Sequence, residues 1–510
     1  MAALSGILLA AGAPPVNFYP LAWVGLAPLF LSLSELKSSG FGEGFTAGFV
    51  FNLAILYWIA FNTGTSLSLA LLTMAVAVLV LAIGWGMAAW LFVRLHNRLG
   101  EIAWLLLPFG WTAWEGWLGH LGELAFPWPL LALTQAAFNP VLQVMEFTGV
   151  WGVTFWVAAL NTAVFTVWWN KSLRVRLLAI LVIVGLGITT ILAARHAEGY
   201  YRPGLPTARV MVVQGNIPAD EKWLRGISAS WAVYDSLTRG GAYLHLDLVV
   251  WPETALPATL IQQSIYADKL SALADQTGAA IITGASDYCR VNGERKPLNA
   301  CFLARPLDGI VARDAKRTLV PFGERVPFQW LFPRLGNLNF GQAEFRPGFF
   351  TPTNFEAAAD SAVIRFPVMV CFESAFPKWS RLAAQSGANL LVTVSNDAWY
   401  GRSSEPAQIA ALSRFRCIET RRAMARASNS GVSFLCDQLG REIASTPLYQ
   451  PAAIAAELPL VTAQTFYTRH GETFLAIATC VFGMGVLFAA LTSRRRRKTD
   501  ISSHTLSPLD

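Results

Sequence analysis

The sequence has few charged residues. Asp, Glu, Lys and Arg make up 14% of its 510 residues, whereas 54% are hydrophobic. Average soluble domains carry roughly 25% charged residues, so this scarcity argues against an ordinary soluble chain and indicates a membrane protein. The scarcity is uneven: charges are sparse over residues 1–195, whereas residues 200–468 have the composition of a globular domain. Pro203, Gly204 and Pro206 interrupt any helix between the two regions.

The sequence also lacks the motifs of a metal site. Its six cysteines form no CxxC pair, and its histidines do not cluster at metal-ligand spacing, so we expect no metal and no cofactor. The net charge of +7 does not indicate nucleic-acid binding, because the basic run at residues 494–498 supplies much of it directly after an apolar segment. Such a run is typical of the cytoplasmic flank of a membrane span.

Long apolar segments predict eight membrane-spanning helices, since about 20 apolar residues cross the hydrocarbon core of a bilayer. The candidate segments are residues 3–19, 21–36, 45–61, 67–95, 102–121, 141–168, 175–194 and 474–491. The first two have the least defined ends, because Pro14 and Pro15 interrupt the apolar stretch. We therefore predict a seven-span transmembrane domain at residues 1–195, a second domain at 205–465, a final span at 473–492 and a cytoplasmic basic tail at 493–510.

Basic residues predict the orientation of these spans. They follow the fourth candidate span (Arg94, His96, Arg98), separate the sixth from the seventh (Lys171, Arg174, Arg176) and follow the eighth (residues 494–498). With eight spans all three clusters lie on one side, which the positive-inside rule makes cytoplasmic. The domain at residues 205–465 is therefore expected on the opposite side of the membrane.

The second domain alternates between short apolar runs and amphipathic segments. Runs rich in valine and isoleucine predict strands at residues 208–214, 246–251, 279–283, 366–370 and 389–394. Residues 220–239, 260–277 and 405–426 are predicted to be helical. Such alternation predicts an α/β domain whose strands are covered on both faces.

Three reactive side chains lie at the edges of strand-like segments. Glu253 follows one strand and is typical of a general base, or of a helix cap or salt-bridge partner. Lys316 can present an ammonium group to a developing oxyanion, although a lone lysine is also typical of solvated surface. Cys371 directly follows another strand, where a thiol can act as a nucleophile beside backbone N–H groups or pack as an inert buried cysteine.

Taken together, the order Glu253, Lys316, Cys371 resembles the Glu–Lys–Cys triad of the nitrilase (carbon–nitrogen hydrolase) superfamily. Further motifs resemble the apolipoprotein N-acyltransferase family: Gln-Gly-Asn-Ile-Pro at residues 214–218, Lys-Trp at 222–223, and the segments 251–255, 316–327, 371–373 and 395–399. The resemblance covers nearly the whole chain. It implies a polytopic α-helical membrane domain and an αββα catalytic domain on the periplasmic side of a bacterial inner membrane.

The resemblance also implies a reaction. A phospholipid, typically phosphatidylethanolamine, would donate an acyl chain to Cys371 as a thioester, and the α-amino group of the S-diacylglyceryl cysteine of an apolipoprotein would accept it. Glu253 would be the general base and Lys316 the oxyanion stabiliser. The Lys316 cation should also favour the thiolate of Cys371. Covalent catalysis of this kind predicts ping-pong kinetics.

Several supporting residues follow from the same resemblance. Glu324 and Glu373 would orient Lys316 and the cysteine turn, or serve as ordinary ion-pair partners. Trp223 matches a tryptophan proposed to contact lipid or gate the site, and a packed aromatic is the alternative. Asn299 also matches and is assigned to supporting structure. Phe372 follows the cysteine where some members carry tyrosine, so a phenol hydroxyl is absent there and the backbone amide remains.

Two questions stay open at the level of sequence. A membrane-tethered amidase or hydrolase of the nitrilase type would carry the same triad and pass its thioester to water. The aromatic-rich segments at residues 328–332 and 338–350 could line a lipid entrance or anchor a buried loop.

Overall fold

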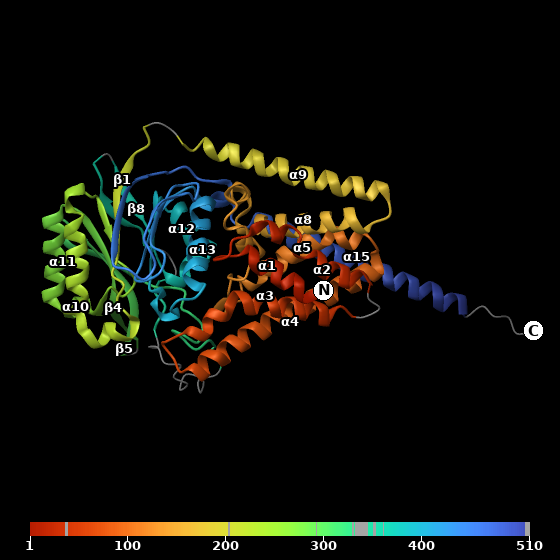
Figure 1. Cartoon of the computed structure of the whole chain (residues 1–510), viewed down its shortest axis with the longest axis horizontal. Coiled ribbons are helices and arrows are strands. Elements are labelled where there is room, and N and C mark those ends of the chain that lie inside the picture. Colours follow the sequence, from red (N-terminus) through yellow and green to blue (C-terminus); the bar gives the residue numbers. More distant parts are fainter. Residues whose placement is uncertain are drawn as a thin grey trace, which may run out of the picture.

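The computed structural model describes residues 1–35, 39–201, 204–291, 293–328, 331, 345–349, 353–360 and 362–504. Outside them lie Pro203 of the predicted boundary, the end of the second candidate span, most of the aromatic-rich segments at 328–332 and 338–350, and residues 505–510 of the predicted tail. The apolar helices gather at one end of the molecule and the α/β layers at the other (Figure 1).

Within the part of the chain that is described, five helices are long and apolar enough to cross a membrane. They are Phe41–Phe61 (α3, Phe41–Leu56, with the turn η2, Tyr57–Phe61), Leu67–Leu99 (α4), Val150–Trp169 (α8), Leu173–Glu198 (α9) and Thr473–Thr492 within α15 (Thr473–His504). Three shorter helices, α1 (Ala2–Gly12), α2 (Ala27–Glu35) and α5 (Ile102–Leu118), pack among them. The chain is therefore a membrane protein, and the number of eight spans stays a prediction.

The helices differ from the candidate spans at identifiable breaks. α1 ends at Gly12, just before the Pro14–Pro15 pair, and the turn η1 (Tyr19–Trp23) leads on to α2. The sixth candidate span, residues 141–168, begins as two single turns, α6 (Asn139–Leu142) and α7 (Met145–Thr148). Gly149, with a φ of +64°, separates these turns from α8 because its backbone lies in a region that interrupts a helix.

The α/β part contains two stacked sheets. The seven-stranded sheet has the order β14-β1-β2-β4-β5-β6 with β3 beside β4, and the five-stranded sheet has the order β13-β12-β11-β10-β9. The strands of the first are β1 (Thr207–Gln214), β2 (Leu248–Val250), β3 (Leu256–Thr259), β4 (Ala280–Val291), β5 (Glu294–Arg305), β6 (Gly309–Ala315) and β14 (Ala452–Pro459). Those of the second are β9 (Val368–Val370), β10 (Leu390–Ser395), β11 (Ala423–Ser428), β12 (Phe434–Cys436) and β13 (Glu442–Ser445), and a separate pair is formed by β7 (Phe355–Ala358) and β8 (Val363–Phe366).

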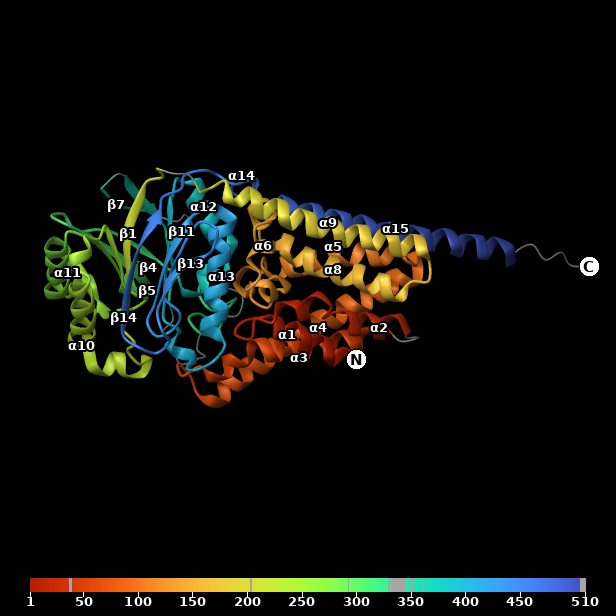
Figure 2. The same ribbon diagram turned by 45° about the horizontal axis from the view of Figure 1, so that its top comes forward.

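Helices cover both outer faces of this stack. α10 (Ala219–Gly240) and α11 (Ser264–Thr277) lie on the seven-stranded sheet, whereas α12 (Pro377–Gln385) and α13 (Glu405–Thr420) lie between the five-stranded sheet and the membrane helices (Figure 2). The short helix α14 (Phe466–His470) precedes α15. The expected αββα sandwich is thus confirmed.

Three hydrophobic cores hold the layers together. One fills the space between the sheets, with Val212 and Val250 facing Val370 and Val392, and a second lies beneath α10 and α11. The third is continuous from the far face of the five-stranded sheet, through α12 and α13, into the membrane helices. The five-stranded sheet and the membrane helices therefore share one core.

One predicted helix, residues 405–426, extends too far. α13 ends at Thr420, and its last predicted residues belong to β11. Arg421 takes a left-handed conformation with a φ of +54°, which ends the helix. Arg422 then donates a 3.0 Å bond from Nε to the Ala388 carbonyl, which favours the extended continuation over another helical turn.

Candidate active site

Glu253 lies in a tight turn after β2. Its side chain is 6% exposed, and the next residue, Thr254, has a φ of +46°, which is uncommon for a β-branched residue. Gly284 of β4 supports the turn from below: a Cβ there would lie 2.5 Å from the Thr254 nitrogen and 2.7 Å from the Glu253 Cα. Glycine at position 284 is therefore needed for the sheet to approach this turn.

Lys316 is buried between two carboxylates at the end of β6. Its Nζ lies 2.9 Å from Glu324 Oε1 and 3.5 Å from Glu253 Oε1. The Asn299 amide joins the same cluster, donating from Nδ2 to Glu253 Oε1 at 2.6 Å, while Glu324 Oε2 accepts from the Val320 N–H at 2.9 Å. Burial alone would lower the pKa of Lys316, but the carboxylates of Glu324 and Glu253 raise it well above its usual range. The lysine is therefore an ammonium group whose position is fixed.

Glu373 links the loop that follows Lys316 (the lysine loop) to the turn that begins at Cys371 (the cysteine turn), and it does so through backbone groups. Its Oε1 accepts from the N–H groups of Arg317 at 2.6 Å and Thr318 at 3.0 Å, and its Oε2 accepts from the Val370 N–H at 2.9 Å. Burial raises the pKa of Glu373, and Arg317 together with these N–H groups offsets part of the rise. The glutamate thus holds the residue after Lys316 close to the end of β9.

Cys371 is the first residue after β9 and has a φ of +53°, so it lies at a backbone position that non-glycine residues seldom adopt. Burial, and then the Glu253 carboxylate, raise the pKa of the Cys371 thiol well above its usual range, while Lys316 offsets part of the effect. The expected preference for thiolate is therefore outweighed in the resting site. Burial and the nearby carboxylate thus favour the protonated thiol over the thiolate.

Phe372 connects the cysteine turn to the membrane region. Its ring is 4% exposed and lies 6.0 Å from Phe126 and 6.4 Å from Trp128, both in the chain that follows α5. The lysine loop makes a similar contact: Phe328 N–H donates to Glu123 Oε2 at 2.5 Å, and Arg325 lies 3.3 Å from Glu123 Oε1. The reactive cluster therefore lies at the junction with the membrane helices.

Trp223 lies outside the buried cluster. It is 51% exposed near the start of α10, in a short helical segment that Gly226, with a φ of +75°, separates from the rest of that helix. The preceding residue, Lys222, is 1% exposed and donates from Nζ to the Thr254 carbonyl at 3.1 Å. Burial lowers the pKa of Lys222 to about 8, and Glu253 opposes the shift. Sequence reasoning found Lys222 within a motif but gave it no role.

A second buried network joins two of the sequence motifs through residues that the sequence analysis did not single out. Asn429 accepts from the Ile217 N–H at 3.1 Å and donates to Asn396 Oδ1 at 3.0 Å, so it ties the segments 214–218 and 395–399 together. Arg426 pairs with Asp397 at 3.0 Å, and both side chains are fully buried. The segments are motifs in the sequence, but Asn429 and Arg426 carry no local signal because only the sheet topology brings them there.

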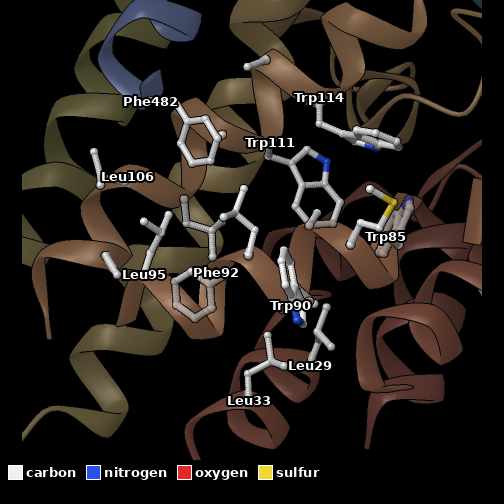
Figure 3. A pocket seen from close by; sticks show the side chains of 18 of the residues that line it. Leu29, Leu33, Trp85, Trp90, Phe92, Leu95, Leu106, Trp111, Trp114 and Phe482 are labelled. Carbon is white, nitrogen blue, oxygen red and sulfur yellow. The ribbon is translucent and has the colours of Figure 1, made fainter. Parts of the chain in front are cut away.

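A cavity of about 330 Å³ lies among α2, α4, α5 and α15, away from this cluster (Figure 3). Its lining is apolar and aromatic, including Trp85, Trp90, Phe92, Trp111 and Phe482. It contains no group that could transfer a proton or attack a carbonyl. Among the described residues, no three His, Cys, Asp or Glu side chains come close enough together to hold a metal ion.

The sandwich and its membrane helices define a class: a membrane protein with a nitrilase-like α/β domain. Residues 209–467 match the carbon-nitrogen hydrolase family, and residues 5–163 match the apolipoprotein N-acyltransferase N-terminal domain. A protein called apolipoprotein N-acyltransferase from Geobacter metallireducens is 34% identical to this chain, over 97% of this chain and 95% of that protein. A protein of the same name from Chlorobaculum tepidum is 32% identical, over 96% of each chain. The chain belongs to the apolipoprotein N-acyltransferase family.

Solved structures resemble about half of the chain. An amidase from Nesterenkonia sp. matches 55% of this chain and 98% of its own, with 16% identity and a TM-score of 0.39. A carbon-nitrogen hydrolase from Helicobacter pylori matches 53% of this chain and 95% of its own, with 16% identity and a TM-score of 0.39.

Proposed function

We propose that this chain transfers an acyl group from a membrane phospholipid, such as phosphatidylethanolamine, to the α-amino group of the S-diacylglyceryl cysteine of bacterial apolipoproteins. One observation carries the proposal: Glu253 and Lys316, which form a buried cluster with Glu324, act electrostatically on the Cys371 thiol where the α/β layers meet the membrane helices. Relatives over the full length bear the name of this activity.

In the first half-reaction, Glu253 accepts the thiol proton as Cys371 attacks the ester carbonyl of the phospholipid. Lys316 and the backbone N–H of Phe372 stabilise the tetrahedral oxyanion. The C–O bond to glycerol then breaks, the glycerol oxygen takes the proton from Glu253, and a lysophospholipid leaves. The acyl chain remains on Cys371 as a thioester. Because the resting sulfur is a thiol, deprotonation and attack are coupled.

In the second half-reaction, Glu253 accepts a proton from the incoming amine, which attacks the thioester carbonyl. The C–S bond breaks, the sulfur takes the proton back, and the triacylated lipoprotein leaves. The two substrates use one site in turn, which gives ping-pong kinetics. Glu324 and Asn299 hold Lys316 and Glu253 in place through both steps, while Glu373 holds the two loops together.

Both substrates are anchored in a membrane, and a soluble enzyme would have to extract a lipid at about 0.8 kcal/mol per CH₂ exposed. We assign residues 1–195 and 473–492 to the bacterial inner membrane, residues 205–465 to its periplasmic side and residues 493–510 to the cytoplasm. We assign Trp223, which is half exposed, to contact with lipid.

The test is intact-mass spectrometry of the purified protein incubated with phosphatidylethanolamine vesicles. Wild type should gain one acyl mass that hydroxylamine removes, whereas Cys371→Ala should gain none. Cys289→Ala, which changes a partly exposed cysteine on β4, should behave as wild type. Adding a diacylglyceryl lipopeptide should then discharge the adduct onto its amine.

Two results would contradict the proposal. An equal adduct on Cys371→Ala would remove the nucleophile from the mechanism. An adduct that water discharges as fast as the lipopeptide would favour the alternative function, a membrane-tethered hydrolase.

A further inference from the structure

Lys222 is a second buried lysine beside the proposed base, and the reaction scheme above does not use it. Lys222 is 1% exposed, and so complete a burial is rare for a lysine. Its Nζ donates 3.1 Å to the carbonyl of Thr254, the residue that follows Glu253. The lysine therefore holds the Glu253 turn from the side of α10, while Gly284 allows β4 to support it from below.

The charges of the cluster need this second cation. Glu253 and Glu324 both contact Lys316 and the Asn299 amide, so two carboxylates share one ammonium group. Two carboxylates at such short range repel each other, and a second cation nearby offsets part of this repulsion. With Lys222 counted, the formal charges of two carboxylates and two ammonium groups cancel.

The other ionisable groups nearby do not replace Lys222. Cys371 is a thiol, and Asp397 and Glu405, which also act on that thiol, are acidic. Glu221, next to Lys222 in the chain, pairs with Arg225 four residues on.

We propose that Lys222 is a positioning residue that keeps Glu253 ionised and correctly oriented as the base for Cys371. The inference rests on the proposed function for the role of Glu253, but not on the identity of the acyl donor. Below a pH of about 8 the lysine carries its charge, so it acts in this way at neutral pH. Since Lys222 directly precedes the half-exposed Trp223, the same contact fixes the segment proposed to meet lipid relative to the base.

The role can be tested without a lipid substrate. Iodoacetamide alkylates a thiolate, and Cys371 forms one by giving its proton to Glu253, so the alkylation rate should fall at acid pH as Glu253 takes a proton from solvent. Intact-mass spectrometry gives this rate for Cys371 across pH. In Glu253→Gln this fall at acid pH should be replaced by a fall at higher pH, where the Cys371 thiol itself titrates, and that change assigns the wild-type fall to Glu253.

Three lysine variants separate charge from packing. Lys222→Gln keeps an N–H donor for the Thr254 carbonyl but removes the charge. The fall of its alkylation rate at acid pH (the acid limb) should move up by roughly one to two pH units, because a cation near a carboxylate has been lost. Lys222→Arg keeps the charge and should leave the limb near its wild-type position. Lys269→Gln, at an exposed lysine on α11, should leave both rate and limb unchanged.

A uniform loss of rate in Lys222→Gln with an unmoved limb would overturn the proposal, because a residue that only packs would behave in that way. Equal shifts in the Gln and Arg variants would overturn it as well. If Lys222→Gln does not fold, the Arg variant decides: a limb within half a pH unit of wild type supports the role of charge, and a larger shift contradicts it. Absence of acylation by phospholipid in wild type would instead contradict the proposed function and leave this test valid.

Discussion

The two helix layers of the sandwich differ in what they face. α11 buries Leu270, Leu273 and Ala274 against the seven-stranded sheet and turns the rest of its surface outward. In α13 every residue except Ala407 and Arg414 is buried, because one side packs on the five-stranded sheet and the other on the membrane helices. The first helix shows the apolar stripe of a surface helix.

The two helix layers also differ in the burial and pairing of their polar side chains. On α13 and the turn after it, Gln408, Glu419 and Arg421 are fully buried, and each bonds to a residue before α9. A buried polar group is costly unless it is paired, so these contacts specify how the two regions dock. On the outward face of α10 the ion pair between Arg239 and Asp235 is partly solvated and is expected to contribute little.

The largest contrast is expected between two ion pairs. Arg421 Nη2 lies 2.9 Å from Glu146 Oε2, with the two side chains 0% and 3% exposed. Arg421→Ala leaves Glu146 buried without its cation and should lower the free energy of unfolding by about 3–5 kcal/mol. Arg239→Ala breaks an exposed pair with Asp235 on α10 and should cost about 0.5 kcal/mol. Thermal unfolding in detergent measures both, and equal losses would contradict the comparison.

A pH effect should come next in size. Burial raises the pKa of Glu419 from 4.5 to about 7, with Arg416 and the Val150 N–H opposing. The folded state then binds a proton more tightly than the unfolded state, so its contribution is fully present below pH 4.5 and is lost as pH rises to about 7. The loss is about 3 kcal/mol for a shift of this size.

Glu419→Gln should remove this part of the pH dependence, because the amide does not ionise but can still accept from Val150. Urea unfolding at several pH values in the same detergent would show it. A variant whose stability changes with pH as steeply as that of wild type would refute the assignment to Glu419.

The smallest of the three effects concerns Gln408. Its Oε1 accepts from the indole N–H of Trp128 at 2.7 Å and of Trp58 at 3.2 Å, and its Nε2 donates to the Ile55 carbonyl at 3.1 Å. Gln408→Leu leaves these groups unpaired and should cost about 1–3 kcal/mol. The acyl-transfer rate should fall too, because Trp128 packs on Phe372 beside the thiol.

Gln276→Leu is the matched control. That glutamine accepts from Arg239 on the outer layer and is exposed, so little change in stability or rate is expected. If the two leucine variants proved equally stable and equally active, the polar contacts of Gln408 would contribute no more to stability or rate than those of an exposed glutamine.

Much of the sandwich could be predicted because its signals are local. The valine-rich runs at residues 208–214 and 389–394 correspond to β1 and β10, and the apolar stripe of α11 lies within the predicted helix. The end of α13 could not be predicted, since Arg421 and Arg422 carry no turn signal and their conformation depends on tertiary partners. The Gly149 break before α8 had a local signal, which the length of the apolar stretch obscured.

The site, too, has parts that local sequence signals predict and parts that depend on tertiary contacts. Glu253, Lys316 and Cys371 follow strands in recognisable motifs, and the structure brings Glu253 and Lys316 into contact and both into electrostatic reach of Cys371. The role of Glu373 as an acceptor for three backbone N–H groups depends on loop geometry that sequence does not encode locally. The burial of Lys222 beside Trp223 shows the same limit, because adjacent residues take opposite environments.

The core shared by the five-stranded sheet and the membrane helices has a consequence for how the protein can be divided. A chain cut after α9 would present the apolar outer surfaces of α12 and α13 to water, an area of the kind that drives aggregation. The membrane helices thus cover the outer face of one half of the sandwich, where a soluble protein would present polar side chains to water. Any smaller, soluble version of this enzyme would first need a new surface on α13.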